Sequence, residues 1–203
     1  HISNEEAAAI IADLDRARGD GKGELPVRFF AGVSYRHLLR LDGSWASSEL
    51  TCAPPHDHVG EPLQTLYPQA KSAAARRTAE RLIELHRAAE PILAAHPVNL
   101  ARRAKGLDEA NSIWTWSPGT RPEMETLKDL YGRTGAVVSA VDLVQGIGVL
   151  AGMEKIVVEG ATGLYDTNYE GKAAAALDAI RRCDLVYVHV EATDEAGHAK
   201  DLP

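Results

Sequence analysis

The spacing of hydrophobic and polar residues along the chain predicts helices and strands in two regions of different character. In the first region, Ser3 and Glu6 have the spacing of a capping box, and the Ala-rich stretch behind them predicts a helix over residues 4–18. β-Branched and aromatic residues interleaved with polar ones over residues 25–42 predict one or two strands, broken near Gly32.

A long helix and two irregular segments complete the first region. Leucine and isoleucine recur at helical spacing over residues 71–97, which predicts a helix that Pro91 can kink and Pro97 ends. Before this helix, two prolines followed by His-Asp-His predict a loop. After it, the apolar stretch within residues 111–120 predicts a short strand that ends in a Pro-Gly turn.

In the second region, short apolar runs alternate with helical patterns. Three runs predict strands over residues 135–140, 155–160 and 184–191, and helices are expected over 141–153 and 169–183. This alternation predicts a parallel sheet covered by helices. The strands are continuously apolar, as expected where both faces of a sheet are buried.

The fold class is therefore α/β, in two regions. Residues 1–110 are expected to form an α+β unit, and residues 111–203 to form part of an α/β unit. A parallel sheet of three or four strands leaves an unpaired edge, and the chain starts with His1 rather than Met. We therefore expect an internal fragment of a longer protein.

Composition narrows the functional classes. The chain has 203 residues, of which 45% are hydrophobic and 25% charged, as in soluble globular proteins. A net charge of −7 argues against general nucleic-acid binding, and no apolar run approaches the ~20 residues of a membrane span. Cys52 and Cys183 lack the spacing of a metal or redox motif, which favours a cytoplasmic protein. The oligomeric state stays open.

The last apolar run leads into a loop with candidate metal ligands. Glu191, Asp194, Glu195 and His198 follow it, where parallel sheets bind their ligands. The carboxylate and imidazole of the Asp-x-x-x-His pair suit Mn²⁺ or Zn²⁺, but two ligands cannot close a site. The alternative is a helix N-cap at Thr193 or Asp194 beside a surface histidine.

Two short motifs in the first region could bind an anion. Arg36 presents a planar guanidinium that suits carboxylate or phosphate, with His37 beside it; the alternative is an exposed charge next to a half-buried histidine. In the second motif, His56 and His58 could hold a metal, or His56 held by Asp57 could contact phosphate. The alternative there is a rigid polar turn.

Two other features favour structural roles. Trp114 and Trp116 are expected on one face of a strand, packed in the core. The Gly-rich stretch at residues 160–172 lacks the spacing of a phosphate-binding loop. It is expected to turn into the following helix, with Asp166 or Asn168 helping to cap it.

Six blocks of sequence resemble one enzyme family. Those blocks are GVSYRHLL, PPHDHVGEP, NSIWTWSPG, GAVVSAVDLVQGIGVLAGM, ATGLYDTNYEGKAAAALDAI and VEATDEAGH. In this order they resemble the archaeal-type cofactor-independent phosphoglycerate mutases, members of the alkaline phosphatase superfamily. The likeness extends over most of the chain.

The resemblance implies a two-domain enzyme of glycolysis and gluconeogenesis. An alkaline-phosphatase-like domain with a parallel or mixed sheet would carry a serine nucleophile and two divalent metal ions, Mn²⁺ first, with Zn²⁺ or Mg²⁺ as alternatives. A smaller α+β domain, inserted into it, would close over the small phosphorylated substrate. Residues 1–110 match the later part of the inserted domain, and residues 111–203 match the return into the phosphatase-like domain. The serine would accept the phosphoryl group and return it to the other hydroxyl, which interconverts 3-phosphoglycerate and 2-phosphoglycerate.

By the same resemblance, Asp194 and His198 match two metal ligands. The substrate-binding candidates in the blocks that face the cleft are Arg36, His37, His56 and Asp57. The family's nucleophilic serine has no counterpart in this sequence, so residues 1–203 alone are expected to be inactive. Two alternatives stay open: a related phosphotransferase or phosphatase acting on another small molecule, and a non-catalytic binding fragment.

Overall fold

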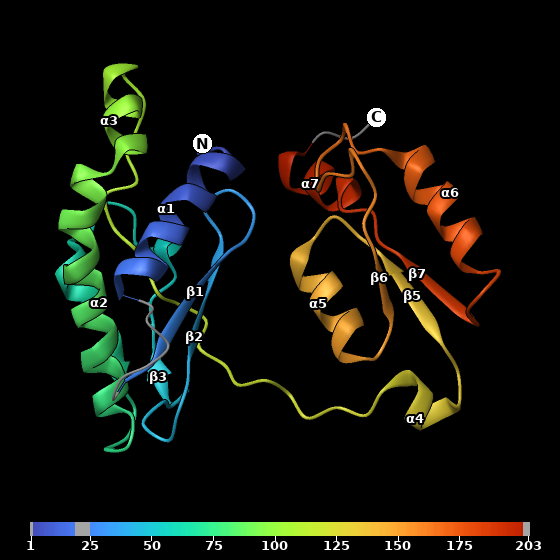
Figure 1. Cartoon of the computed structure of the whole chain (residues 1–203), viewed down its shortest axis with the longest axis horizontal. Helices are drawn as coiled ribbons and strands as arrows, with labels where there is room; N and C mark the ends of the chain where they lie inside the picture. The colour runs from blue at the N-terminus through green and yellow to red at the C-terminus, as the bar shows by residue number, and fades with distance from the viewer. Residues whose placement is uncertain (1, 19–24, 201–203) are drawn as a thin grey trace. The chain divides into compact units, whose positions relative to one another are not determined.

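A computed structural model describes residues 2–18 and 25–200, with the backbone alone for residues 198 and 199. The chain divides into two compact units, residues 1–120 and residues 121–203, each with its own strands and helices (Figure 1). The assignment of these parts to an inserted domain and a phosphatase-like domain stays a prediction.

The first unit combines three helices with two small antiparallel sheets. The helices are α1 (Asn4–Arg18), α2 (Arg76–Ala95) and α3 (Pro97–Ala104). The sheets pair β1 (Val27–Ala31) with β2 (His37–Leu41), and β3 (Leu50–Thr51) with β4 (Gln69–Ala70). Two 3₁₀ turns lie between β3 and β4, at Pro55–Asp57 and Leu63–Leu66.

The helix expected over residues 4–18 is confirmed, and the one or two strands expected over residues 25–42 are two, β1 and β2, paired as a hairpin. Ser3 and Glu6 form the capping box, because each side chain accepts the other's backbone N–H, at 3.1 and 3.2 Å. Helix α1 packs on β1, and the Asp15 carboxylate accepts the backbone N–H of Phe29 at 2.8 Å. The second long helix runs through Pro91 and ends before Pro97. The buried apolar cluster combines residues of α1, β1 and α2, among them Ile10, Leu14, Val27, Leu82 and Leu85.

The strand expected within residues 111–120 is wrong. The segment is extended, but side chains hold it in place of a neighbouring strand. The Trp114 indole N–H donates to the carbonyl of Ala53 at 2.8 Å, and Asn99 bonds both the N–H and the carbonyl of Ala110. An apolar run forms a strand only where another backbone is within pairing distance, which local spacing does not reveal.

The second unit has the predicted alternation of strands and helices. After the short helix α4 (Leu127–Tyr131), its elements in chain order are β5 (Gly135–Val138), α5 (Asp142–Leu150), β6 (Glu154–Ile156), α6 (Tyr169–Ala179), β7 (Leu185–Val188) and α7 (Ala192–Ala199). The strands form one parallel sheet in the order β6-β5-β7. Figure 1 shows α5 and α6 on either side of this sheet.

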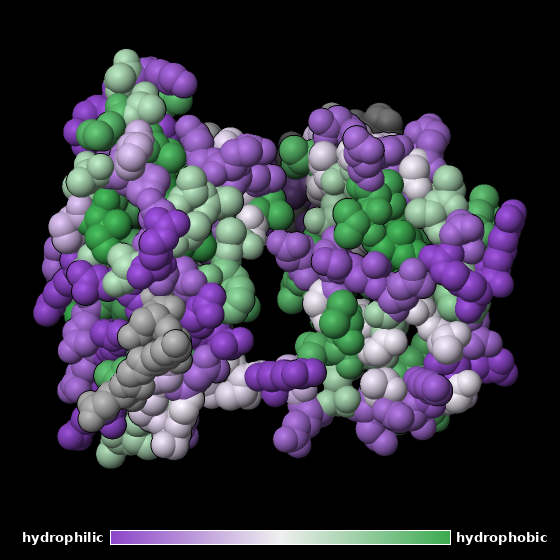
Figure 2. All heavy atoms as spheres, viewed as in Figure 1, coloured by the Kyte–Doolittle hydropathy of each residue, from purple (hydrophilic) through white to green (hydrophobic). Residues whose placement is uncertain are grey.

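The expectation that the strands are buried on both faces is confirmed only for the central strand, β5. Every residue of β5 is buried, whereas β6 and β7 are largely exposed, including Leu185 and Tyr187. Figure 2 shows hydrophobic side chains on the surface of this unit. Among the described strands, β6 and β7 form the two edges of the sheet, and the described helices leave most of their side chains exposed. In the described part of the chain, no helix is long and apolar enough to cross a membrane.

Close packing of α5 against β5 depends on Gly148. A Cβ atom built there would lie 2.5 Å from Cγ1 of Val137, well inside van der Waals contact. Gly146, in the same helix, has no heavy atom within 4 Å of the equivalent position. The two glycines therefore differ in the space that they leave, although both are helical.

We predict opposite effects for alanine at these two glycines. Gly148→Ala should lower the free energy of unfolding by about 2 kcal/mol, because α5 must move away from Val137. Gly146→Ala should raise it by up to about 1 kcal/mol, because alanine favours the helix. Urea titrations followed by far-UV circular dichroism measure both. Equal effects of the two substitutions would contradict the close contact.

A buried histidine connects α2 to the extended segment that follows α3. Nε2 of His86 accepts the backbone N–H of Thr115 at 3.3 Å and lies 3.0 Å from its hydroxyl. Burial lowers the pKa of His86 to about 4. A proton on Nε2 would place a donor against the Thr115 N–H, so the folded unit favours neutral imidazole.

This pKa predicts acid-sensitive stability in the first unit. The unfolded chain binds the proton near pH 6.5 and the folded chain near pH 4, so stability is complete above pH 6.5 and falls as the pH drops toward 4. At pH 5 the loss should be about 2 kcal/mol. His86→Gln keeps an acceptor without titrating, so it should remove this part of the pH dependence. Urea titrations read by tryptophan fluorescence report on this unit, because Trp45, Trp114 and Trp116 all lie in it.

Candidate functional site

Polar side chains gather at the carboxyl edge of the parallel sheet in the second unit. Ser139 directly follows β5, His189 directly follows β7, and Lys172 lies in the first turn of α6. Ser139 and Lys172 are buried. Ligands of open α/β sheets bind at this edge, so these side chains define the candidate site.

The ring of His189 bridges two partners. Its Nδ1 lies 3.4 Å from the hydroxyl of Ser139, and its Nε2 lies 3.1 Å from a carboxylate oxygen of Glu191. The carbonyl of the same histidine accepts a hydrogen bond from Nζ of Lys172 at 3.3 Å. One residue therefore contacts an alcohol, a carboxylate and an ammonium group.

The start of α6 is fixed by a side-chain cap. Oδ1 of Asn168 accepts the N–H of Gly171 at 2.8 Å, and Nδ2 of Asn168 donates to the carbonyl of Glu159 at 2.8 Å. The cap expected from Asn168 is confirmed, whereas Asp166 instead accepts from the hydroxyl of Thr162. This geometry places Lys172 in the first turn of the helix, facing the end of β7.

Lys172 is a charged residue in an unusually buried place. Only 2% of its surface is exposed. Burial lowers the pKa of its ammonium group, and the nearby carboxylate of Glu191 acts in the opposite direction. A lysine ammonium has three donors, so beside the His189 carbonyl it can also bind an anionic group.

Sequence reasoning missed both Lys172 and His189. Lys172 precedes a run of alanines and resembles a solvated helix residue, and His189 lies in a run expected to be a buried strand. A weak signal existed, because Lys172 is the one cation in the first two turns of a helix that follows a Gly-rich stretch.

The predicted metal ligands lie on helix α7 after β7, so the loop expected for this segment is wrong. Asp194 is exposed in the first turn of α7, and its N–H donates to the carbonyl of Glu191 at 2.8 Å. His198 lies four residues later in the same helix, so both residues share one face; its side chain lies outside the described residues. The alternative that Thr193 or Asp194 caps the helix is not what the structure has, since Glu191 holds the N-cap position.

The donor chemistry of this helix fits part of a metal site. Carboxylate and imidazole at helical spacing are suitable ligands for Mn²⁺ or Zn²⁺. Among the side chains that the structure describes, no group of three or more His, Cys, Asp or Glu residues could hold a metal ion. Asp194 and His198 as metal ligands therefore stay a prediction, and a complete site would need further ligands.

The anion-binding candidates around the hairpin lie in the first unit. Arg36 is exposed in the turn between β1 and β2, and its guanidinium stacks on the ring of Tyr35 at 5.4 Å. His37 begins β2, and its Nδ1 accepts the N–H of Gly32 at 3.2 Å, which closes the hairpin. Arg36 is therefore accessible to an anion, while His37 already has a structural contact.

The His-Asp-His motif forms an exposed turn whose members face different partners. Nε2 of His56 lies 3.7 Å from a carboxylate oxygen of Asp57, and His58 pairs with Glu61 at 2.9 Å. Because the two imidazoles have different carboxylate partners, they do not converge on one metal position. The ring of His56 contacts Trp116 edge-on, with ring centroids 5.5 Å apart.

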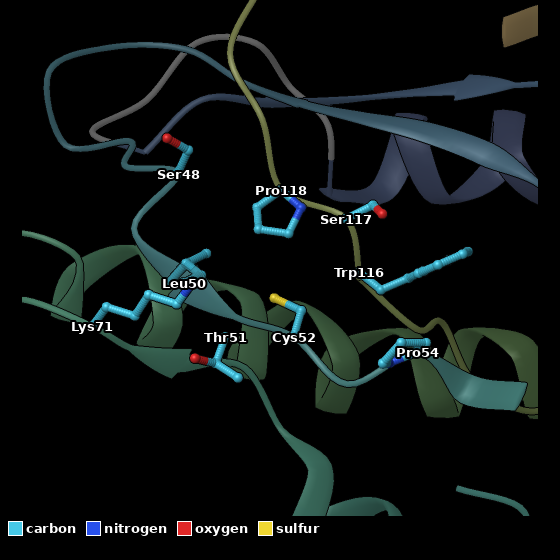
Figure 3. A pocket seen from close by; sticks show the side chains of 9 residues that line it. All are labelled: Ser48, Leu50, Thr51, Cys52, Pro54, Lys71, Trp116, Ser117 and Pro118. Carbon is cyan, nitrogen blue, oxygen red and sulfur yellow. The ribbon is translucent and has the colours of Figure 1, made fainter. Parts of the chain in front are cut away.

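The expectation that Trp116 packs in the core is wrong, because 45% of its surface is exposed. It lines a pocket of about 350 Å³ in the first unit (Figure 3), together with Ser48, Leu50, Thr51, Cys52, Pro54, Lys71, Ser117 and Pro118. Burial raises the pKa of the Cys52 thiol, with Lys71 acting in the opposite direction. A thiol held protonated is a weak nucleophile, so this pocket offers no activated catalytic group.

Comparison with known proteins gives one consistent result. A family profile described as 2,3-bisphosphoglycerate-independent phosphoglycerate mutase matches residues 1–99. Over its full length the chain is 47% identical to a protein of that name from Methanosarcina acetivorans, and it covers 48% of that relative. It is 44% identical to a probable enzyme of the same name from Geobacter sulfurreducens, again covering 48%. The chain thus spans about half the length of the curated relatives it matches.

Two solved structures are similar to this chain. A cofactor-independent phosphoglycerate mutase from Thermoplasma acidophilum matches 89% of the chain and 48% of its own length, with a TM-score of 0.60 and 28% identity. A protein from Pyrococcus horikoshii matches 97% of the chain and 45% of its own length, with a TM-score of 0.72 and 24% identity. The second likeness bears on the fold alone.

Burial removes the ammonium of Lys172 from water, which disfavours its charged form. We therefore predict that the fold does not depend on this charge. Lys172→Met keeps most of the stem, so at pH 7 we expect the free energy of unfolding to stay unchanged or to rise by about 1 kcal/mol. Because the folded pKa is lowered, the unfolded chain binds more protons, so the wild type should gain stability as the pH rises toward 10.5. Urea titrations at pH 7 and pH 9.5 should show a smaller gain in Lys172→Met.

Exposed Lys155 provides the matched control. Lys155→Met should show the wild-type pH response, because its ammonium is hydrated in both states. A marked loss of stability in Lys172→Met at pH 7 would show instead that the charge holds the fold together.

Proposed function

We propose that the chain is a member of the family of 2,3-bisphosphoglycerate-independent phosphoglycerate mutases, which its profile match and its relatives support, and that it supplies about half of an enzyme that interconverts 3-phosphoglycerate and 2-phosphoglycerate. The observation that carries the proposal is the polar cluster at the carboxyl edge of the second unit's sheet, in a chain 47% identical over its whole length to a relative of that name.

Phosphoryl transfer requires positioning and neutralisation of the charge on the phosphoryl oxygens. The buried ammonium of Lys172 is suited to an oxygen of the phosphoryl group, because little water competes for its donors. Its position depends on the Asn168 cap and on the His189 carbonyl. Arg36 in the first unit is the proposed contact for the substrate's carboxylate or phosphate, with His37, His56 and Asp57 as further candidates.

Divalent metal ions are part of the proposal. Asp194 and His198 would hold one ion, with Mn²⁺ preferred over Zn²⁺ or Mg²⁺, and further ligands would come from outside these 203 residues. Bound there, the ion would supply positive charge for the phosphoryl group. The phosphoryl-accepting serine is proposed to lie outside these residues as well, as the family resemblance implies.

A hybrid enzyme tests this function directly. The chain replaces the matching 48% of the Methanosarcina acetivorans relative, and conversion of 3-phosphoglycerate is measured by coupling 2-phosphoglycerate to its dehydration. We expect turnover that a chelator abolishes and Mn²⁺ restores. Asp194→Asn should lower kcat/KM by about a hundredfold or more, because a metal ligand is lost. The 203 residues alone should give no turnover.

Asp178→Asn is the matched control. Asp178 is exposed in the last turn of α6, at the opposite edge of the sheet, and it pairs with Arg182 on the surface. Its loss should leave kcat/KM unchanged. A folded, metal-loaded hybrid that hydrolyses or transfers phosphate on another compound, but leaves 3-phosphoglycerate untouched, would favour the related phosphatase or phosphotransferase. A hybrid with no activity on any phosphorylated compound would favour a binding role.

A further inference from the structure

The imidazole of His189, at the end of β7, lies between Ser139, which follows β5, and Glu191, the N-cap residue of α7. We propose that His189 is a positioning residue, which fixes the first turn of α7, and with it Asp194, against the carboxyl end of β5. The functional meaning of this position rests on the proposed function, while the contacts themselves do not.

The backbone of His189 is anchored to the centre of the sheet. Its N–H donates to the carbonyl of Val138 at 2.9 Å, which extends the pairing of β5 and β7 by one step. The side chain at this position therefore lies beside Ser139, the residue that follows Val138. The anchor therefore lies at the end of β5, the most buried of the three strands in this sheet.

The hydroxyl of Ser139 contacts the ring of His189. The oxygen of this hydroxyl accepts the N–H of Val141 at 3.0 Å. The hydroxyl proton has two acceptors within reach, the carbonyl of Val141 at 3.5 Å and Nδ1 of His189 at 3.4 Å. With Nδ1 as acceptor, the ring proton lies on Nε2 and donates to Glu191 at 3.1 Å. The shorter contact, to a carboxylate, is the stronger of the two.

Glu191 links the imidazole of His189 to the first turn of α7. It occupies the N-cap position without using its side chain as the cap, and its carbonyl accepts the N–H groups of Asp194 and Glu195, at 2.8 and 3.2 Å. Holding the carboxylate of Glu191 therefore holds the residue on which the first turn is built. The carboxylate of Glu191 pairs with the imidazole of His189 and does not cap the helix. A residue with only a capping role would use its side chain on the N–H groups of the first turn.

The same histidine also sets the position of the buried cation. Its carbonyl accepts the hydrogen bond from Lys172, so a shift of His189 moves the ammonium and the start of α7 together. Residues that orient a metal ligand from behind it act in this way, and their loss weakens the site without removing a ligand.

Three substitutions of His189 in the 203-residue chain test the proposal. The measurement is amide hydrogen exchange at Asp194 and Glu195, followed by NMR, with no metal or substrate added. Glutamine can place an N–H near the position of Nε2, whereas asparagine reaches only the Ser139 side. We expect exchange at these two amides to rise about fivefold or more in His189→Ala and His189→Asn, and to stay near the wild-type rate in His189→Gln.

Amides within α6 serve as the internal control and should not change. If His189→Ala fails to fold, Glu191→Ala removes the other partner and should raise exchange at the same two amides. Unchanged exchange in His189→Ala or Glu191→Ala, or glutamine no better than asparagine, overturns the proposal. Because the measurement needs neither metal nor turnover, a failed hybrid assay and a failed positioning role are separate results.

Discussion

Parallel pairing of β5 with both of its neighbours is the constraint on which the second unit depends. Every residue of β5 is buried, and its two partners leave much of their surface exposed. Parallel pairing brings the carboxyl ends of β5 and β7 to one edge, so Ser139 and His189 meet although 50 positions separate them. Helix α6 starts at the same edge, because it must run back against the strands, and it therefore brings Lys172 there.

Local patterns predicted the long helices and the strands of the parallel sheet, but not the exposure of the side chains or helix α7, which was expected to be a loop. The capping box at Ser3 and the cap at Asn168 follow from contacts within a few residues, which spacing in the sequence records. The strand expected within residues 111–120 failed because pairing depends on a distant backbone. Trp116 is exposed and Trp114 is half-buried for a related reason: without a strand the two rings share no common face toward the core.

The same distinction separates the site residues that could be predicted from those that could not. Asp194 and His198 could be proposed as metal ligands because both donors lie in one short motif after an apolar run, and the family resemblance implies a role for them; that role stays a prediction. Lys172 and His189 were missed because their chemistry depends on packing. An ammonium group on a helix is ordinary until the helix turns it into the sheet, and a histidine at the end of a strand is ordinary until Ser139 and Glu191 flank its ring.

A buried ammonium that hydrogen-bonds one carbonyl, with the carboxylate of Glu191 nearby, still costs solvation free energy. Folds keep such groups mainly where a ligand later completes their hydrogen bonds. The Asn168 cap fixes the helix under the cation, and His189 fixes the carbonyl against it. Both restraints reduce the freedom of the ammonium before any ligand arrives. An anion that binds there then meets donors already in place, which is the arrangement that electrostatic catalysis of phosphoryl transfer demands.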